Sequence, residues 1–144
     1  MADLDPLIRL KKHAVEEKQR VVAQLYREVE NLDRQKKVVE EQMAREKKLA
    51  EEMERPEAIT YYGRYAEGAR IKIAAFQAAI KKIEGRIEAA QEEMRAAFAE
   101  MKKIQITQTN REKREDKKRQ KKEDELLDEV AIEQYRRKVL EDEK

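Results

Sequence analysis

The sequence contains no cysteine, which excludes disulfide bonds and every site that depends on a thiolate, whether catalytic or metal-binding. It also has no tryptophan, one histidine and only 5% aromatic residues. Three glycines and two prolines in 144 residues leave few points at which a helix would be interrupted. These absences argue against a compact globule, which needs a thicker apolar core, and favour long helices.

Long apolar runs are missing as well. No stretch approaches the ~20 apolar residues that span a bilayer, and we expect no signal peptide because the N-terminus lacks its apolar core. The net charge is only +2, so no bulk field directs the chain towards nucleic acid or an anionic membrane. The absence of cysteine fits a reducing compartment. We therefore expect a cytoplasmic protein.

Charged residues make up 46% of the chain, and the apolar residues among them are regularly spaced. Regular spacing argues against disorder. The most regular stretch is 73–104, where apolar residues recur three and four positions apart, as in a heptad seam. These residues are Ile73, Phe76, Ile80, Ile83, Ile87, Ala90, Met94, Ala97, Met101 and Ile104. A lone helix would leave this stripe in water, so the sequence predicts a partner helix.

A second, weaker seam precedes it. Asp5 is the predicted N-cap, Pro6 the first helical residue, and no glycine or proline follows before Pro56. Ten of the fourteen inward positions are apolar, from Ile8 and Val15 through Ala50 and Met53, and the exceptions are Lys11, Lys18, Lys36 and Glu46. A helix of this length would be about 75 Å long.

The fold class predicted is all-α, with two long helices in an antiparallel coiled-coil hairpin, a short helical or turn tip and an overhanging C-terminal helix. We place the first helix at about 5–54, the tip at about 55–68 and the second helix at about 69–141, in a single domain. Pro56 is expected to end the first helix. The tip holds two glycines and a tyrosine cluster that either closes it or docks a partner: Gly63, Gly68, Tyr61, Tyr62 and Tyr65.

Our preferred register sets Met53 opposite Ile73 and Lys18 opposite Gln108. In this register the second helix extends beyond the end of the first, and its last twenty or so residues have no partner. Apolar residues return there, spread around the helix: Leu126, Leu127, Val130, Ala131, Ile132, Tyr135, Val139 and Leu140. We interpret them as a surface covered by another molecule, either a foreign partner or a second copy.

No pattern in the sequence indicates an enzyme, a cofactor or a metal site, and the only histidine, His13, is interpreted as a solvated surface residue. The segment 111–122 contains eight Lys or Arg in twelve residues. It has no interleaved aromatic residues, so nucleic acid is not the expected partner, although a nucleic-acid-binding coiled coil stays an alternative. A solvated face and docking on an acidic protein surface are equally open. The chain alone is expected to be monomeric, and a self-assembling parallel scaffold is the other alternative.

Three segments resemble the FliJ family, the coiled-coil component of the bacterial flagellar export apparatus. They are LIRLKKHAVEEKQRVVAQLYREVENL at 7–32, YYGRYAEG at 61–68, and KKIQITQTNREKREDKKRQKKEDELLDEVAIEQYRRK at 102–138. The last combines a basic run with the tripeptide LDE and an apolar–aromatic tail, and is similar to the family's alphaproteobacterial form. Injectisome proteins of the YscO type share this architecture, so the sequence does not separate the two secretion systems.

The resemblance implies a non-enzymatic stalk that binds and stimulates a hexameric export ATPase, contacts the membrane-embedded export gate and escorts substrate chaperones. Its place would be the cytoplasm, associated peripherally with the inner membrane at the flagellar base. The implied contacts with the ATPase ring are Arg114, Lys118 and Lys122 for acidic loops and Leu127, Val130, Ile132 and Tyr135 for apolar contact. The implied gate contacts are Tyr65, Ala69 and Phe76, with Lys72 interrupting the apolar spacing expected there.

Overall fold

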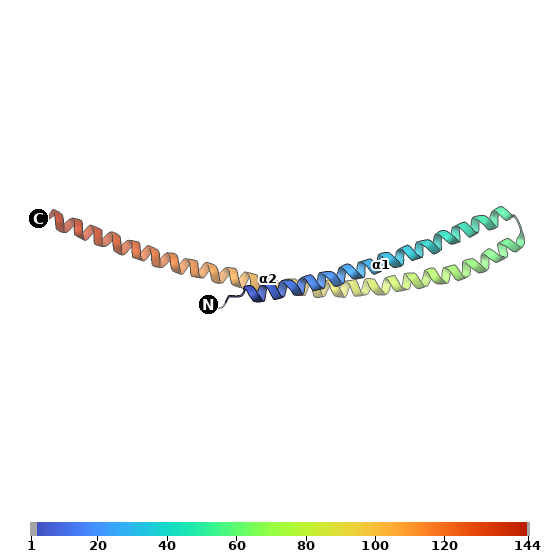
Figure 1. Ribbon diagram of the computed structural model, residues 1–144, viewed down its shortest axis with the longest axis horizontal. Helices are drawn as coiled ribbons and strands as arrows, with labels where there is room; N and C mark the ends of the chain where they lie inside the picture. Colours follow the sequence, from blue (N-terminus) through green and yellow to red (C-terminus); the bar gives the residue numbers. More distant parts are fainter. Residues whose placement is uncertain (1–2, 144) are drawn as a thin grey trace. The chain divides into compact units, whose positions relative to one another are not determined.

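The structure, a computed structural model, describes residues 3–143. Two helices account for nearly all of this part: α1, Asp5–Met53, with 49 residues, and α2, Pro56–Asp142, with 87. No strand occurs among the described residues, and the two helices pack against each other (Figure 1). The all-helical prediction is confirmed, because the long stretches free of glycine and proline leave the helical hydrogen bonds unbroken.

The start of α1 is held by Asp3 rather than by the predicted cap Asp5. Asp3 Oδ1 accepts a hydrogen bond of 3.0 Å from the Asp5 backbone N–H, and the Leu4 carbonyl accepts the first helical bond, 2.9 Å, from Ile8. Asp5 therefore lies inside the first turn. The predicted start was wrong by one residue, since α1 begins at Asp5 rather than at Pro6. Proline fits anywhere in a first turn, where N–H groups have no helical partner.

The chain reverses over two residues, Glu54 and Arg55. Glu54 has a φ of 54°, the left-handed conformation that commonly ends a helix and is usually filled by glycine. Pro56 is the first residue of α2, where its fixed φ suits the helix, and the Arg55 carbonyl accepts bonds of 3.1 and 3.3 Å from the N–H groups of Ala58 and Ile59.

The predicted tip over 55–68 is therefore wrong, since helix α2 runs through all of it except Arg55. Gly63 and Gly68 are helical residues with negative φ and open space around them. Glycine in a helix costs only about 1 kcal/mol, so two glycines near proline did not suffice to break the helix.

The structure divides into two units, residues 11–99 and residues 3–10 with 100–143. In the 11–99 unit, α1 and α2 lie side by side (Figure 1). The buried residues there are small or β-branched and come from both helices: Val15, Val22, Ala50, Ala66, Ala69, Ile87 and Ala90. Five of these seven occupy predicted seam positions, while Ala66 and Ala69 continue the seam towards the turn. In the other unit, Met101 is buried and Gln108 Nε2 lies 3.5 Å from Asp3 Oδ1.

Contacts within the 11–99 unit correct the predicted register. Lys18 Nζ lies 2.9 Å from Glu93 Oε2, and Gln91 Nε2 donates a 3.0 Å hydrogen bond to the Tyr26 hydroxyl. The predicted partner of Lys18, Gln108, lies about two heptads farther along α2. The error follows from the turn: because α2 starts at Pro56 rather than near residue 69, each α1 residue meets an earlier turn of α2.

Candidate functional site

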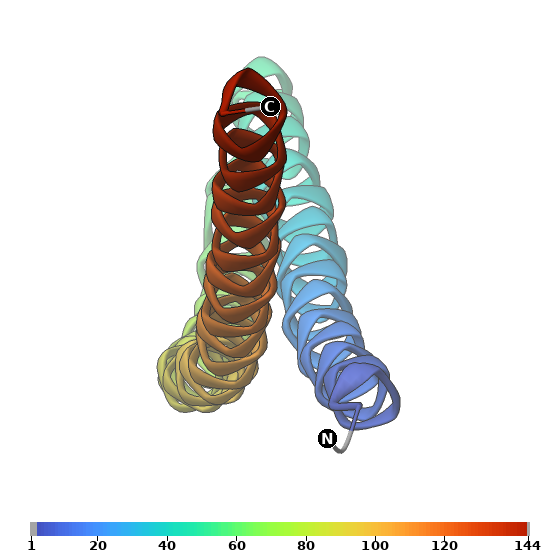
Figure 2. The same cartoon turned by 90° about the vertical axis from the view of Figure 1, so that its left-hand side faces the viewer.

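The most exposed apolar surface belongs to the C-terminal part of α2. Every residue from 112 to 143 is exposed, and α2 remains regular through this segment (Figure 2). Tyr135 is 71% exposed and Leu127 66%, values normal for lysine rather than for large apolar side chains. Concentrations of exposed apolar residues are common at interaction surfaces, so this segment is the candidate site. We call residues 123–143 the tail.

The tail's apolar residues fall on more than one side of the helix. Leu127, Ala131, Tyr135 and Val139 are spaced four apart, so they form one slanting stripe, which we call the tail stripe. Val130 and Ile132, the other predicted ring contacts, flank this stripe on opposite sides, because residues two apart point about 200° away from each other. The tail could therefore be contacted from several directions at once.

The predicted basic contacts precede the tail on one face. Arg114, Lys118 and Lys122 are spaced four apart and exposed, and within the described part of the chain none of them forms an ion pair. The neighbouring pair Arg119–Asp116, 2.6 Å, is local and exposed on both sides, so it contributes little to stability. The three cations are thus available to an acidic partner.

The predicted gate contacts are placed differently. Ala69 is 5% exposed and packs between the helices, so its side chain is not available to a partner, while Tyr65 and Phe76 are half-buried. Tyr65 and Ala69 share a groove of about 270 Å³ with Val39, Gln42, Arg64, Gly68 and Lys72. The structure therefore brings Tyr65 and Ala69 together, whereas Phe76 does not line this groove.

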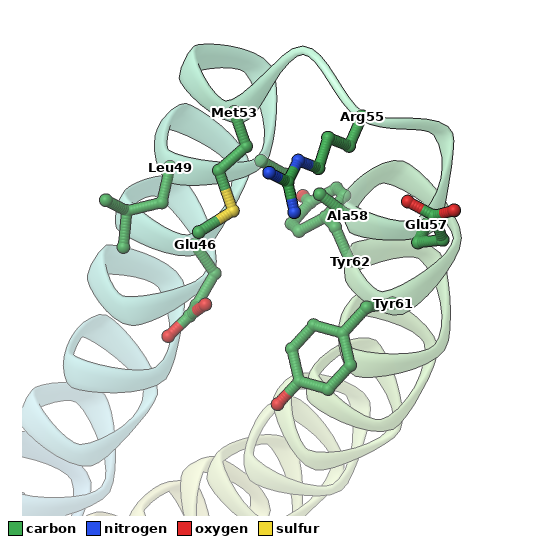
Figure 3. A pocket seen from close by; sticks show the side chains of 9 residues that line it. Glu46, Leu49, Met53, Arg55, Glu57, Ala58, Tyr61 and Tyr62 are labelled. Atoms are coloured by element: carbon green, nitrogen blue, oxygen red, sulfur yellow. The ribbon is translucent and has the colours of Figure 1, made fainter.

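A cavity beside the turn was not predicted. It measures about 360 Å³, and Met53, Arg55 and Tyr61 point into the gap between the two helices (Figure 3). The remaining lining residues are Glu46, Leu49, Ala50, Glu57, Ala58 and Tyr62. Met53 and Tyr61 are more than 60% exposed. The tyrosine cluster was the signal in the sequence, but the cavity depends on the two-residue turn, which was placed wrongly.

The described residues offer no cluster of three or more acidic or histidine side chains that could hold a metal ion. His13 is 63% exposed, with its Nε2 3.9 Å from Glu17 Oε1 one turn on. Across residues 3–143, neither helix is apolar enough over a sufficient length to cross a membrane. A hydrogen bond from Lys37, with the positive charges of Lys37 and Lys36, lowers the pKa of the Asp33 carboxyl below its usual value.

Comparison with known proteins gives no further constraint on this site. No protein-family model matches the chain, and neither a curated protein nor a solved structure is similar to it.

Proposed function

We propose that this protein is a stalk-like, non-enzymatic component of a flagellar-type protein export apparatus, and that its tail binds and stimulates a hexameric export ATPase. The single observation that carries the proposal is the exposure of the apolar side chains between Leu126 and Leu140 on a regular helix. Leaving such a helix in water has a cost, since each large apolar side chain gains about 1.5–3 kcal/mol on burial. A ring that surrounds the tail supplies that burial from several directions.

The two helices form the support for this tail. We propose that they pair as an antiparallel coiled coil, with residues 11–53 of α1 against the first part of α2. The pairs Lys18–Glu93 and Tyr26–Gln91 support this, because early residues of α1 contact later residues of α2. A coiled coil of this kind needs no globular domain.

The basic face precedes the tail and adds charge to the same interaction. Arg114, Lys118 and Lys122 would face acidic loops of the ring, while Leu127, Val130, Ile132 and Tyr135 enter apolar contacts. Exposed charges of this kind speed association more than they add affinity. Stimulation should therefore weaken with salt when the three cations are intact, and depend less on salt when they are neutralised.

The gate contact is proposed on a reduced set of residues. Tyr65 and the half-buried Phe76 can still meet an export-gate protein, whereas Ala69 would act only by allowing the helices to approach closely. Contact with substrate chaperones and peripheral association with the inner membrane follow from the same family resemblance.

The test is stimulation of a hexameric export ATPase from the same organism, measured as phosphate release with wild-type chain and with a chain truncated after Glu125. The proposal expects the truncated chain to lose stimulation while keeping its helical circular dichroism. A variant with Lys47→Ala, an exposed cation on α1 outside the tail, is the control and should stimulate normally. Equal stimulation by truncated and full chains would remove the role of the tail.

A further inference from the structure

The exposed part of α2 contains four blocks of like charge that alternate in sign. Residues 119–122 carry three cations, residues 123–125 are all acidic, residues 136–138 are all basic, and residues 141–143 are all acidic. All of these residues are exposed. Within the described tail, Arg137 Nη2 lies 3.7 Å from Glu133 Oε1, one turn earlier, and both side chains are more than two thirds exposed, so this ion pair is weak.

When two copies of this segment run antiparallel, blocks of opposite charge face each other. If a second copy of the helix runs in the opposite direction, with the crossing point near Val130 and Ala131, residues 123–125 of each copy fall opposite residues 136–138 of the other. The basic block 119–122 then falls beside the acidic block 141–143. A parallel pairing would instead place every block against itself, with like charges opposed along the whole segment.

The apolar residues agree with the same alignment. Between the charge blocks lie Leu127, Ala131 and Tyr135 of the tail stripe, all exposed. The acidic residues Asp128, Glu129 and Glu133 lie there as well, and the like charges of Asp128 and Glu133 oppose each other in this alignment, against the larger number of opposite charges in the flanking blocks. The reversed alignment brings Leu127 of one copy near Tyr135 of the other, at both ends of the contact. Ala131 falls near its own copy at the crossing point, where a small side chain lets two helices approach closely.

We propose that a second copy of this chain covers the tail, as an antiparallel pairing of residues 119–143 in each copy. This departs from the monomer expected from the sequence, and it does not depend on the proposed export function. The pairing would bury the tail stripe of both copies in the free protein. A ring or any other partner that uses the tail stripe then competes with the second copy for it.

The experiment is sedimentation equilibrium of the full chain over a wide concentration range, without any ATPase. The wild-type protein is expected to reach twice the monomer mass. Two block variants test the alignment: Arg136→Glu/Arg137→Glu/Lys138→Glu, and Glu123→Lys/Asp124→Lys/Glu125→Lys. Each variant alone should bind itself at least roughly tenfold more weakly at low salt, because attractive pairs become repulsive.

The chain carrying both block changes restores opposite charges in the antiparallel alignment, so it should dimerise as the wild type does. A mixture of the two single-block variants should associate as well. Glu28→Lys/Glu30→Lys/Glu41→Lys, exposed changes on α1, are the control and should leave the dimer unchanged. Circular dichroism checks that each variant keeps its helices.

Three results would overturn the proposal. A wild-type chain that stays at monomer mass at the highest concentration has no second copy on its tail. A dimer that tolerates both single-block variants is joined elsewhere. Association of the two single-block variants when mixed, but of neither the wild type nor any variant alone, indicates a parallel pairing. None of these results bears on stimulation of an ATPase, which is measured separately.

Discussion

Lys18 Nζ and Glu93 Oε2 lie 2.9 Å apart, which identifies the turns of α1 and α2 that face each other. We predict that Lys18→Cys/Glu93→Cys can be joined by a short bismaleimide within one chain. The control pair, Lys18→Cys/Arg86→Cys, lies one heptad away, about 10 Å along α2, and should react far less. Peptide mapping after digestion measures both yields, and equal yields would contradict the register.

The pair itself should matter little for stability. Its side chains are 42% and 62% exposed, and an exposed pair of this kind contributes about 0.2–1 kcal/mol. The register must therefore be held by the apolar seam and by the short turn, which the next predictions address.

Burial in the seam predicts which isoleucines stabilise the fold. Ile87 is 6% exposed, so Ile87→Ala should lower the free energy of unfolding by about 2–5 kcal/mol. Ile71 lies on the same helix and is 67% exposed, so Ile71→Ala should change it by no more than about 0.5 kcal/mol. Urea unfolding followed by circular dichroism measures both, and similar losses would show that the packing is different.

The turn predicts a stabilising change. Glu54 adopts a left-handed φ of 54°, which costs a side chain about 1–2 kcal/mol and glycine almost nothing. Glu54→Gly should therefore raise the free energy of unfolding by about 1 kcal/mol. Glu52→Gly, two residues earlier and inside α1, should lower it by about the same amount. A loss of stability in Glu54→Gly would mean that the turn is built differently.

Replacing the helical glycines by alanine should also stabilise the fold. A Cβ added at Gly85 or Gly63 would meet nothing within 4 Å, and neither residue has a positive φ. Gly85→Ala and Gly63→Ala should each raise the free energy of unfolding by about 1 kcal/mol, and the two gains should add because the sites are far apart in sequence. A thermal melt of the single and double variants checks both statements. A destabilised Gly63→Ala would show that Gly63 belongs to a turn, as the sequence first suggested.

The stability of the fold should depend on pH in the acid range because of Asp33. Its hydrogen bond with Lys37, together with the nearby positive charges of Lys37 and Lys36, lowers its pKa in the folded state. The stabilisation is therefore fully present above the unfolded pKa of about 3.9 and is lost as pH falls through the lower, folded value. Asp33→Asn should melt below wild type at pH 7, and the two melting temperatures should converge in stronger acid. A difference that persists at every pH would assign the effect to packing.

The heptad pattern predicted the helices and the buried face because burial acts on every third or fourth residue and repeats many times. Val15, Val22, Ile87 and Ala90 lie where the spacing placed them. The turn depends on only a few residues. Pro56 is compatible both with the end of a preceding helix and with the start of the next one, so it does not fix which of the two occurs. Because the turn was placed wrongly, the predicted register was wrong as well. Heptad spacing could not correct it, since two alignments separated by two heptads bury the same kinds of residue.

The candidate site was predictable only in part for a related reason. The exposed apolar tail followed from finding no partner for residues such as Leu127 and Tyr135 within the chain. The burial of Ala69 and the cavity at Met53 and Tyr61 depend on how the helices meet near the turn, which composition and spacing do not determine.

The most direct measurement of the central claim is ATPase stimulation by a chain whose tail stripe carries charges, Leu127→Glu/Tyr135→Glu. Val38→Glu is the control, because Val38 is also an exposed apolar residue, at 51%, but lies on α1 away from the tail. We predict that the tail variant loses stimulation of the cognate hexamer, whereas the Val38 variant keeps it. Undiminished stimulation by the tail variant, with both proteins equally helical, would contradict the account.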